Sequence, residues 1–245
     1  MPDASFSGGS GPVVLAVATA PERRGLEFVG TTAGHADRVD ILQTGVGPLE
    51  ADAIRGHLVE VQARGLVSIG TCGSLDPAAG RGTVMVPVAL ICTNGQCVPV
   101  DADWRSRIVR SLSPATDRHE GLLITVDRVL GTPEQKRRVR EQSNATAVDM
   151  ESATLQQAAR LAGIPFVALR VVLDGAGEVI PASVASGVDR AGDATPLRLL
   201  RALCMRPADI PGLLRLASSL RVANAALERA IRNSAAELID PRQRR

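Results

Sequence analysis

Aromatic side chains are nearly absent from this sequence. Its 245 residues include no Tyr, one Trp and three Phe, so that aromatic residues make up 2% of the chain. Proteins that bind single-stranded nucleic acid stack the bases on aromatic side chains, so this class is disfavoured. The net charge is only +2, which gives no strong attraction to nucleic acid or to an anionic membrane. We therefore expect no nucleic-acid partner.

Cysteine and histidine are too few and too scattered for a metal site. The four cysteines form no Cys-x-x-Cys pair, and the chain has three His. Zinc sites need several such ligands at short spacing, so we expect no metal. Cysteines without a disulfide framework are typical of a reducing compartment, which predicts a cytoplasmic protein.

Long apolar runs are missing as well. The run from Pro12 to Ala18 is too short to span a bilayer, and no basic segment precedes it as in a signal peptide. It therefore predicts a strand. Residues 1–11 are rich in Gly and Ser, and we expect them to be disordered.

Beyond residue 12, strand patterns alternate with helix patterns. The hydrophobic content of 45% is sufficient for one sizeable core. Alternation of this kind predicts a single α/β domain over residues 12–240, with a helical C-terminal extension. The apolar stripe of the last helix, from Gly212 to about Ser234, is expected to pack in the core or at an oligomer interface.

Two carboxylates come close together in this predicted architecture. A short apolar strand ending at Val148 turns polar at Asp149, and a helix follows Glu151. A second buried strand, residues 164–173, ends at Asp174. Because ligands of open α/β sheets bind outside the carboxyl ends of the strands, both acids should face one cleft. Taken alone, Glu151 would be a helix-capping carboxylate.

Two more loops follow expected strands. The first strand leads into a charged turn that contains Glu22, and the third leads into a glycine-rich loop with Thr71, Cys72 and Gly73. Small residues let a ligand approach the backbone, and free amides with a hydroxyl suit an anion or a polarised water. An exposed charged turn and an ordinary glycine turn are the alternatives.

The Val-Asp-Met-Glu-Ser-Ala run at residues 148–153, with a strand ending in Asp downstream, resembles the nucleoside phosphorylase and methylthioadenosine/adenosylhomocysteine nucleosidase superfamily. The glycine-rich loop and the segment from Gly80 to Pro87 extend the resemblance. It implies a three-layer α/β/α fold with a central mixed, twisted sheet. It also implies no metal or organic cofactor, a small-molecule purine nucleoside as substrate, and a homo-oligomer.

The resemblance implies a role for each acid. Asp174 would protonate the purine while the N-ribosidic bond breaks, and Glu151 would accept hydrogen bonds from the ribose hydroxyls. Glu22 matches the acid that helps to activate water in the nucleosidase branch. The substrate-binding residues that it implies are Thr71, Cys72 and Gly73 in the glycine-rich loop, and Val148 and Met150 beside Glu151.

The segment from Asp174 to Pro181 and the two Pro-punctuated helices after it resemble the hopanoid-associated phosphorylase branch, whose members act on adenosylhopane. This resemblance implies phosphorolysis with phosphate as co-substrate, a lipid-linked substrate and transient contact with a membrane surface. Ser68 stands where hexameric phosphorylases carry an arginine for phosphate, so a hydrolytic nucleosidase is an alternative. A non-catalytic protein that binds a nucleoside or a lipid is a third hypothesis.

Two smaller expectations concern polar helices. Trp104 lies in a polar helix and is expected at the surface or at an edge. The charged run from Glu134 to Arg140 is expected to be a solvated helix face.

Overall fold

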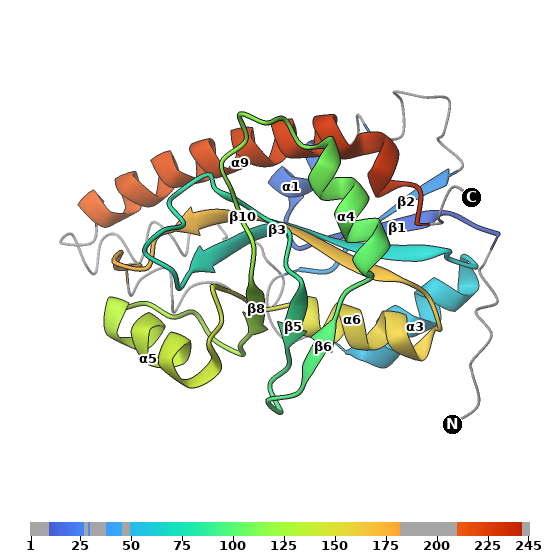
Figure 1. Cartoon of the computed structure of the whole chain (residues 1–245), viewed down its shortest axis with the longest axis horizontal. Coiled ribbons are helices and arrows are strands. Elements are labelled where there is room, and N and C mark those ends of the chain that lie inside the picture. Colours follow the sequence, from blue (N-terminus) through green and yellow to red (C-terminus); the bar gives the residue numbers. More distant parts are fainter. Residues whose placement is uncertain (1–9, 27–28, 30–37, 46–49, 182–209, 242–245) are drawn as a thin grey trace.

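A mixed sheet runs through the centre of the molecule (Figure 1). The computed structural model describes residues 10–26, 29, 38–45, 50–181 and 210–241. These residues contribute ten strands in the order β6-β5-β8-β9-β3-β10-β4-β7, and β1 pairs with both β2 and β3. The strands are β1 (Val13–Val17), β2 (Val39–Gln43), β3 (Gly65–Ser74), β4 (Val84–Met85), β5 (Ala89–Ile91), β6 (Cys97–Pro99), β7 (Arg118–His119), β8 (Leu122–Thr125), β9 (Ala147–Asp149) and β10 (Phe166–Asp174).

The ten-residue strand β3 organises the sheet. Its first half pairs in parallel with β1, and β10 runs parallel to it from Leu66 to Gly73. Its last two residues pair with β9 in the antiparallel direction, with Gly73 opposite Val148. The carboxyl ends of β1, β3 and β10 therefore point the same way, whereas β9 ends in the opposite direction.

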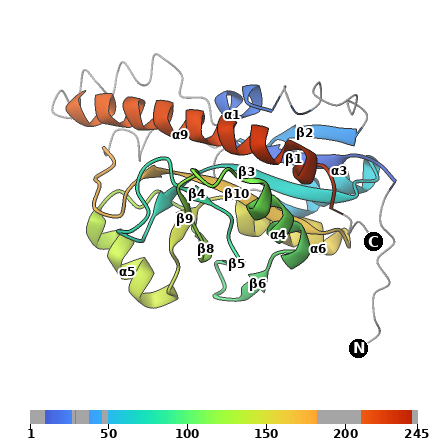
Figure 2. The ribbon, with the colours of Figure 1, turned by 45° about the horizontal axis from the view of Figure 1, so that its top comes forward.

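Two layers of helices cover the sheet, as Figures 1 and 2 show. Alternate residues of β1 divide between two apolar clusters, because successive side chains of a strand point to opposite faces. The cluster on one face includes side chains of α4 (Ala102–Ser111) and α9 (Ile210–Leu238). The other includes those of α3 (Ala51–Glu60) and α6 (Ser152–Leu161). The expected three-layer α/β/α fold with a mixed central sheet is thus confirmed.

The C-terminal helix α9 is longer than expected. Ala223, Leu227 and Ile231 of its apolar stripe are buried in the core, which confirms the packing expectation for this half of the helix. Leu220 is 40% exposed, so the stripe leaves the core toward the helix N-terminus. Residues 182–209, which include the other helix expected here, lie outside the described residues.

The expectation for Trp104 was wrong. Its side chain is fully buried in α4, and its indole N–H donates a 2.7 Å hydrogen bond to the carbonyl of Glu237 near the end of α9. Arg107 on the same helix also bonds to Glu237, at 3.1 Å. A tryptophan in a polar helix therefore joins two helices, because its large apolar ring is buried while its one donor finds a carbonyl.

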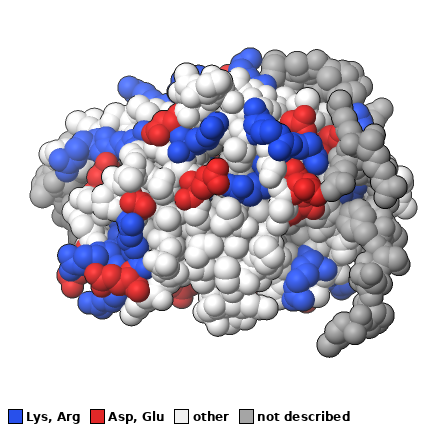
Figure 3. All heavy atoms as spheres, in the orientation of Figure 1, with Lys and Arg blue, Asp and Glu red and all other residues white. Residues whose placement is uncertain are grey.

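The visible surface carries charges of both signs. Lys, Arg, Asp and Glu are interspersed over α9 and α5 (Pro133–Ser143), whereas the area over β5, β6 and β8 is largely uncharged (Figure 3). Here a hollow of about 590 Å³ is lined by Ile91, Cys92, Leu122, Ile124 and Asp127 among others, and its described lining does not include the candidate site residues. In the described part of the chain, every helix is too short or too polar to cross a bilayer.

Candidate active site

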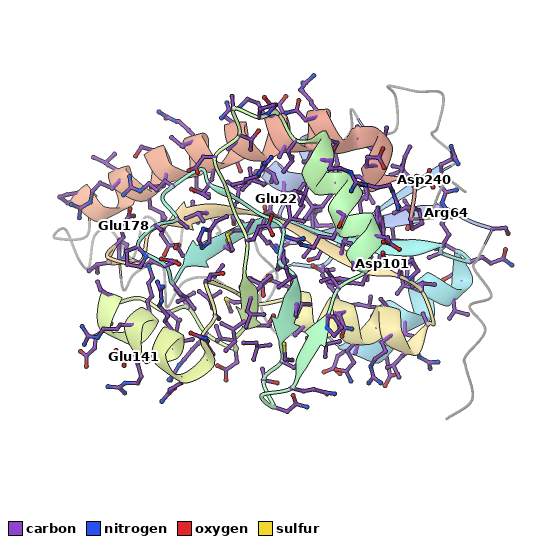
Figure 4. The ribbon with its side chains drawn as sticks, viewed as in Figure 1. Glu22, Arg64, Asp101, Glu141, Glu178 and Asp240 are labelled. Carbon is purple, nitrogen blue, oxygen red and sulfur yellow. The ribbon has the colours of Figure 1, made fainter. Side chains whose placement is uncertain are left out.

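Glu22 is held against the central strand by its local sequence. Thr19 precedes the short helix α1 (Ala20–Arg24), and Glu22 reaches back to accept hydrogen bonds from the Thr19 amide and hydroxyl, both at 2.9 Å. This is the reciprocal geometry of a capping box. The other carboxylate oxygen of Glu22 accepts the Thr71 amide of β3 at 3.1 Å. Glu22 is 5% exposed and lies between α1 and the central strands (Figure 4), so the expected alternative of an exposed turn was wrong.

Arg170 is the charged centre of this region, and the sequence reasoning missed it. It stands in the middle of the apolar strand β10 and is 2% exposed. One terminal nitrogen forms an ion pair with Asp149 at 2.9 Å and donates to the hydroxyls of Ser68 and Ser152, at 2.6 and 2.8 Å. A lone arginine inside a buried strand was the signal that could have identified it, since a buried charge requires partners.

The guanidinium of Arg170 is stabilised in its charged form. Burial alone lowers its pKa, but surrounding carboxylates outweigh burial and raise the pKa above its ordinary value. These carboxylates are those of Asp149, Glu151 and Glu22. Ser68, which stands where hexameric phosphorylases carry an arginine for phosphate, accepts a hydrogen bond from Arg170 instead.

Glu151 sits at the junction of β9 and α6. It is the residue before the first turn of α6 and is 6% exposed, and its charge acts on Arg170. Met150 beside it is partly exposed, and Val148 is buried against Gly73. Asp149 accepts the Thr125 hydroxyl at 2.7 Å, which fixes the turn from strand to helix.

Asp174 ends β10, next to an irregularity in its pairing with β3. It is 5% exposed, and its carboxylate oxygens lie close to Gly73, where an added Cβ would meet them at 3.3 and 3.5 Å. Burial raises the pKa of Asp174, against the opposing effect of the Lys136 ammonium. This carboxyl group therefore holds a proton more readily than an ordinary aspartate.

Lys136 corrects the expectation for the charged run in α5. Its side chain is 1% exposed and forms an ion pair with Asp174, whereas the neighbouring Arg137 and Arg138 are each 69% exposed. Most of the run is therefore a solvated face, but one of its cations points into the protein. The spacing of residues in the sequence could not show that Lys136 is the buried cation, because its neighbours in α5 also have long, flexible, charged side chains.

The structure brings most of the sequence-predicted residues to one stretch of β3, residues 70–73. Glu22 and Arg170 lie at its beginning, Asp174 and Val148 lie at its end, and the charge of Glu151 acts on Arg170. The side chain of Cys72 does not join these residues, because it packs in the apolar cluster that also contains side chains of α3 and α6. Burial raises the pKa of its thiol far above the ordinary value, so Cys72 is neutral there.

The arrangement provides two different carboxyl groups about one strand. One, Glu22, accepts hydrogen bonds from the Thr19 and Thr71 amides and lies beside Arg170. The other, Asp174, is buried and has a raised pKa, which suits an acid.

The sequence matches a known protein family over most of its length. Residues 15–202 match the phosphorylase superfamily, and the chain belongs to it. A 5'-methylthioadenosine/S-adenosylhomocysteine nucleosidase of Staphylococcus aureus is 24% identical over 155 residues, which cover 56% of this chain and 68% of the relative.

Solved structures share the fold. The nucleosidase of the same name from Neisseria meningitidis, in complex with methylthio-immucillin-A, aligns with a TM-score of 0.70 at 18% identity, over 93% of this chain and 98% of its own. Futalosine hydrolase of Helicobacter pylori aligns with a TM-score of 0.63 at 14% identity, over 80% of this chain and 98% of its own.

Replacing Gly70 with Ala tests the packing of the charged centre. An ideal Cβ at Gly70 would lie 2.5 Å from a terminal nitrogen of Arg170 and 2.8 Å from an oxygen of Glu22. We expect Gly70→Ala to lower the free energy of unfolding by about 1–3 kcal/mol, as overpacking does, because one of the two side chains must move. Urea unfolding followed by circular dichroism measures the change.

Gly80→Ala is the matched control, since nothing lies within 4 Å of its added Cβ. It should leave the free energy of unfolding nearly unchanged. Equal stability of the Gly70 and Gly80 variants would contradict the close packing of Arg170 and Glu22.

Proposed function

We propose that this protein cleaves the N-ribosidic bond of a purine nucleoside. The observation that carries the proposal is the pair of buried carboxyl groups, Glu22 and Asp174, beside residues 70–73 of β3, with Glu151 nearby. Membership of the phosphorylase superfamily supports it. The names of the relatives and neighbours, among them nucleosidases for methylthioadenosine and adenosylhomocysteine, support adenine as the base.

In this proposal Asp174 donates a proton to the purine, so that the base leaves as a neutral molecule. Its raised pKa supports the role, because the acid must hold its proton before the bond breaks. Glu151 accepts hydrogen bonds from the ribose hydroxyls and stabilises the positive charge that develops on the sugar. Met150 packs on the ribose, and Thr71, Gly73 and the backbone of Cys72 line the nucleophile and base positions.

Water is the nucleophile that the surroundings of Glu22 favour. Its carboxylate already accepts the Thr71 amide, and it lies beside Arg170. The Glu22 carboxylate repels the negative charge of a phosphate bound beside it, whereas a water can give its proton to the carboxylate. We therefore propose hydrolysis as the first candidate reaction and phosphorolysis as the second.

Comparing adenine release with and without phosphate distinguishes hydrolysis from phosphorolysis. We expect wild-type protein to release adenine from 5′-substituted adenosines in phosphate-free buffer, and Glu22→Gln to lower this rate by about 10²–10⁴-fold, as expected for loss of a general base. Adenine is measured by chromatography. Glu141→Gln is the control, because Glu141 is 68% exposed on α5 and should keep wild-type turnover.

Adenine release that requires phosphate, with Glu22→Gln equally active, would reverse the order of the two candidates. Absence of adenine under both conditions and across several 5′ substituents would favour a binding protein and reject the enzyme.

Phosphorolysis of adenosylhopane is the second candidate, on a specific observation. Val179, five residues after Asp174, is 64% exposed, and Leu214 and Leu220 on α9 are 68% and 40% exposed. Aliphatic side chains of this kind suit a saturated polycyclic tail, whose burial contributes about 25 cal/mol per Å² of apolar area. Further apolar residues of the following segment, Val184, Leu197, Leu199, Leu200 and Leu203, lie outside the described residues.

The size of the 5′ substituent separates the candidates for the substrate. If the tail leaves past Val179, adenosine with a bulky apolar 5′ group should be cleaved with higher kcat/KM than methylthioadenosine. Val179→Asp should then lower kcat/KM for the bulky substrate by about tenfold, which corresponds to loss of about one buried apolar side chain.

Val59→Asp is the matched control, because Val59 is 59% exposed on α3. It should leave both substrates unaffected. Turnover of methylthioadenosine alone would rule out the lipid-linked substrate and leave the nucleosidase intact.

A further inference from the structure

Lys136 occupies an unfavourable place for a lysine. Thr132 caps α5, and Lys136 follows in the first turn, where its amide donates to the Thr132 carbonyl at 3.1 Å. The first turn of a helix carries the positive end of the helix dipole, which disfavours a cation. Burial of an ammonium group costs further free energy unless it is fully paired. The local structure of α5 therefore does not account for a buried lysine at this position.

The ammonium group of Lys136 donates all its hydrogen bonds to the end of β10 and to the segment that follows it. It donates to the Asp174 carboxylate, to the Gly175 carbonyl at 2.7 Å and to the Glu178 carbonyl at 3.2 Å. A lysine ammonium has three donors, so each proton has an acceptor. One side chain thus fixes both the end of β10 and the turn after it.

Other contacts already hold this segment in place. Arg81 forms two 2.7 Å hydrogen bonds to the carboxylate of Glu178, and the Ile180 amide donates to the Gly131 carbonyl at 2.9 Å. An apolar side chain would fill the space of Lys136 without the cost of burying a charge. The position of Lys136 against Asp174 is therefore better explained if its charge acts on the carboxyl group of Asp174.

We propose that Lys136 is a positioning residue for Asp174: its ammonium orients the carboxyl group and stabilises the carboxylate that is left when Asp174 has given up its proton. The inference rests on the function proposed above. As the C–N bond breaks, its electron pair stays with the base, and the proton of Asp174 forms a new N–H bond there. The oxygen of the attacking water bonds to the sugar carbon and its proton passes to Glu22; after the base leaves, Glu22 releases this proton to solvent and Asp174 regains one.

Several charged or titratable groups face Asp174 in the described part of the chain. Lys136 comes from α5, Arg81 from the connection between β3 and β4, Glu178 from the segment after β10 and Cys72 from β3. The Cys72 thiol is neutral over the working range, and the carboxylate of Glu178 is paired with Arg81. Lys136 is therefore the cation whose removal should change the titration of Asp174 most.

The pKa of Asp174 in the free protein tests the inference directly. Carboxyl ¹³C NMR, with the resonance assigned through Asp174→Asn, follows the titration without any substrate. Lys136→Met and Lys136→Gln should raise the pKa of Asp174 by about 1–3 units, the usual effect of losing a neighbouring opposite charge. Lys136→Arg should keep it near the wild-type value, and Arg81→Met, the control, should shift it less than either neutral variant.

Kinetics provide the second readout. Because the protonated form of Asp174 is required, the alkaline limb of the kcat/KM profile should move to higher pH in the neutral variants. The plateau of kcat should fall by about tenfold or more, since a weaker acid donates its proton less readily, with little change in KM. Lys136→Arg should recover most of kcat.

Unchanged Asp174 titration in two folded neutral variants would overturn the role of Lys136, even if the enzyme is active. Lack of adenine release by the wild type would instead reject the proposed function, and the NMR titration would still decide whether Lys136 controls Asp174. If Lys136→Met fails to fold, Lys136→Gln and Lys136→Arg give the comparison.

Discussion

A guanidinium group buried in the middle of the sheet is the constraint on which the site depends. Arg170 is one of few charged residues in the central strands, and its burial requires partners on several neighbours. Asp149 provides the ion pair, and Ser68 and Ser152 provide hydroxyls. Removal of one member of a buried pair costs about 3–5 kcal/mol, so these residues hold one another in position.

The consequences of this cation extend to the neighbouring elements. A Cβ at Gly70 would lie 2.5 Å from Arg170 and 2.8 Å from Glu22, so a side chain there would displace one of them. Glu22 in turn joins the first strand and α1 to β3 through the Thr71 amide. The same strand passes Asp174 three residues later, where Lys136 replaces Arg170 as the nearby cation. One strand therefore separates two carboxyl groups with different electrostatic surroundings.

Much of the fold followed from the sequence, because it depends on patterns that are local. Alternating strand and helix periods predicted an α/β domain, and the resemblance implied its three layers. The rule that ligands bind at the carboxyl ends of strands holds for Asp174 but not for Glu151, because β9 runs antiparallel to β3 while β10 runs parallel to it. The same rule placed Glu22 and the loop after the third strand at the same edge as Asp174. These positions depend on topology, which a single sequence can reveal.

The residues that the sequence reasoning missed depend on contacts between distant segments. Trp104 is buried because the end of α9 covers it, 133 residues further along the chain. Lys136 is buried because the segment after β10 supplies acceptors, although its neighbours in α5 have the same charge and remain exposed. Nothing within the local spacing distinguishes such residues, since the partners that neutralise a buried charge come from elsewhere in the fold.

Adenine release by Asp174→Asn tests the central claim most directly. The substitution keeps the size of the side chain and removes the proton that the leaving base needs. The account predicts a rate lowered by about 10²–10⁴-fold, the usual contribution of general acid–base catalysis, in a protein whose urea unfolding curve shows that it is folded. A folded Asp174→Asn protein that releases adenine at nearly the wild-type rate would contradict the account.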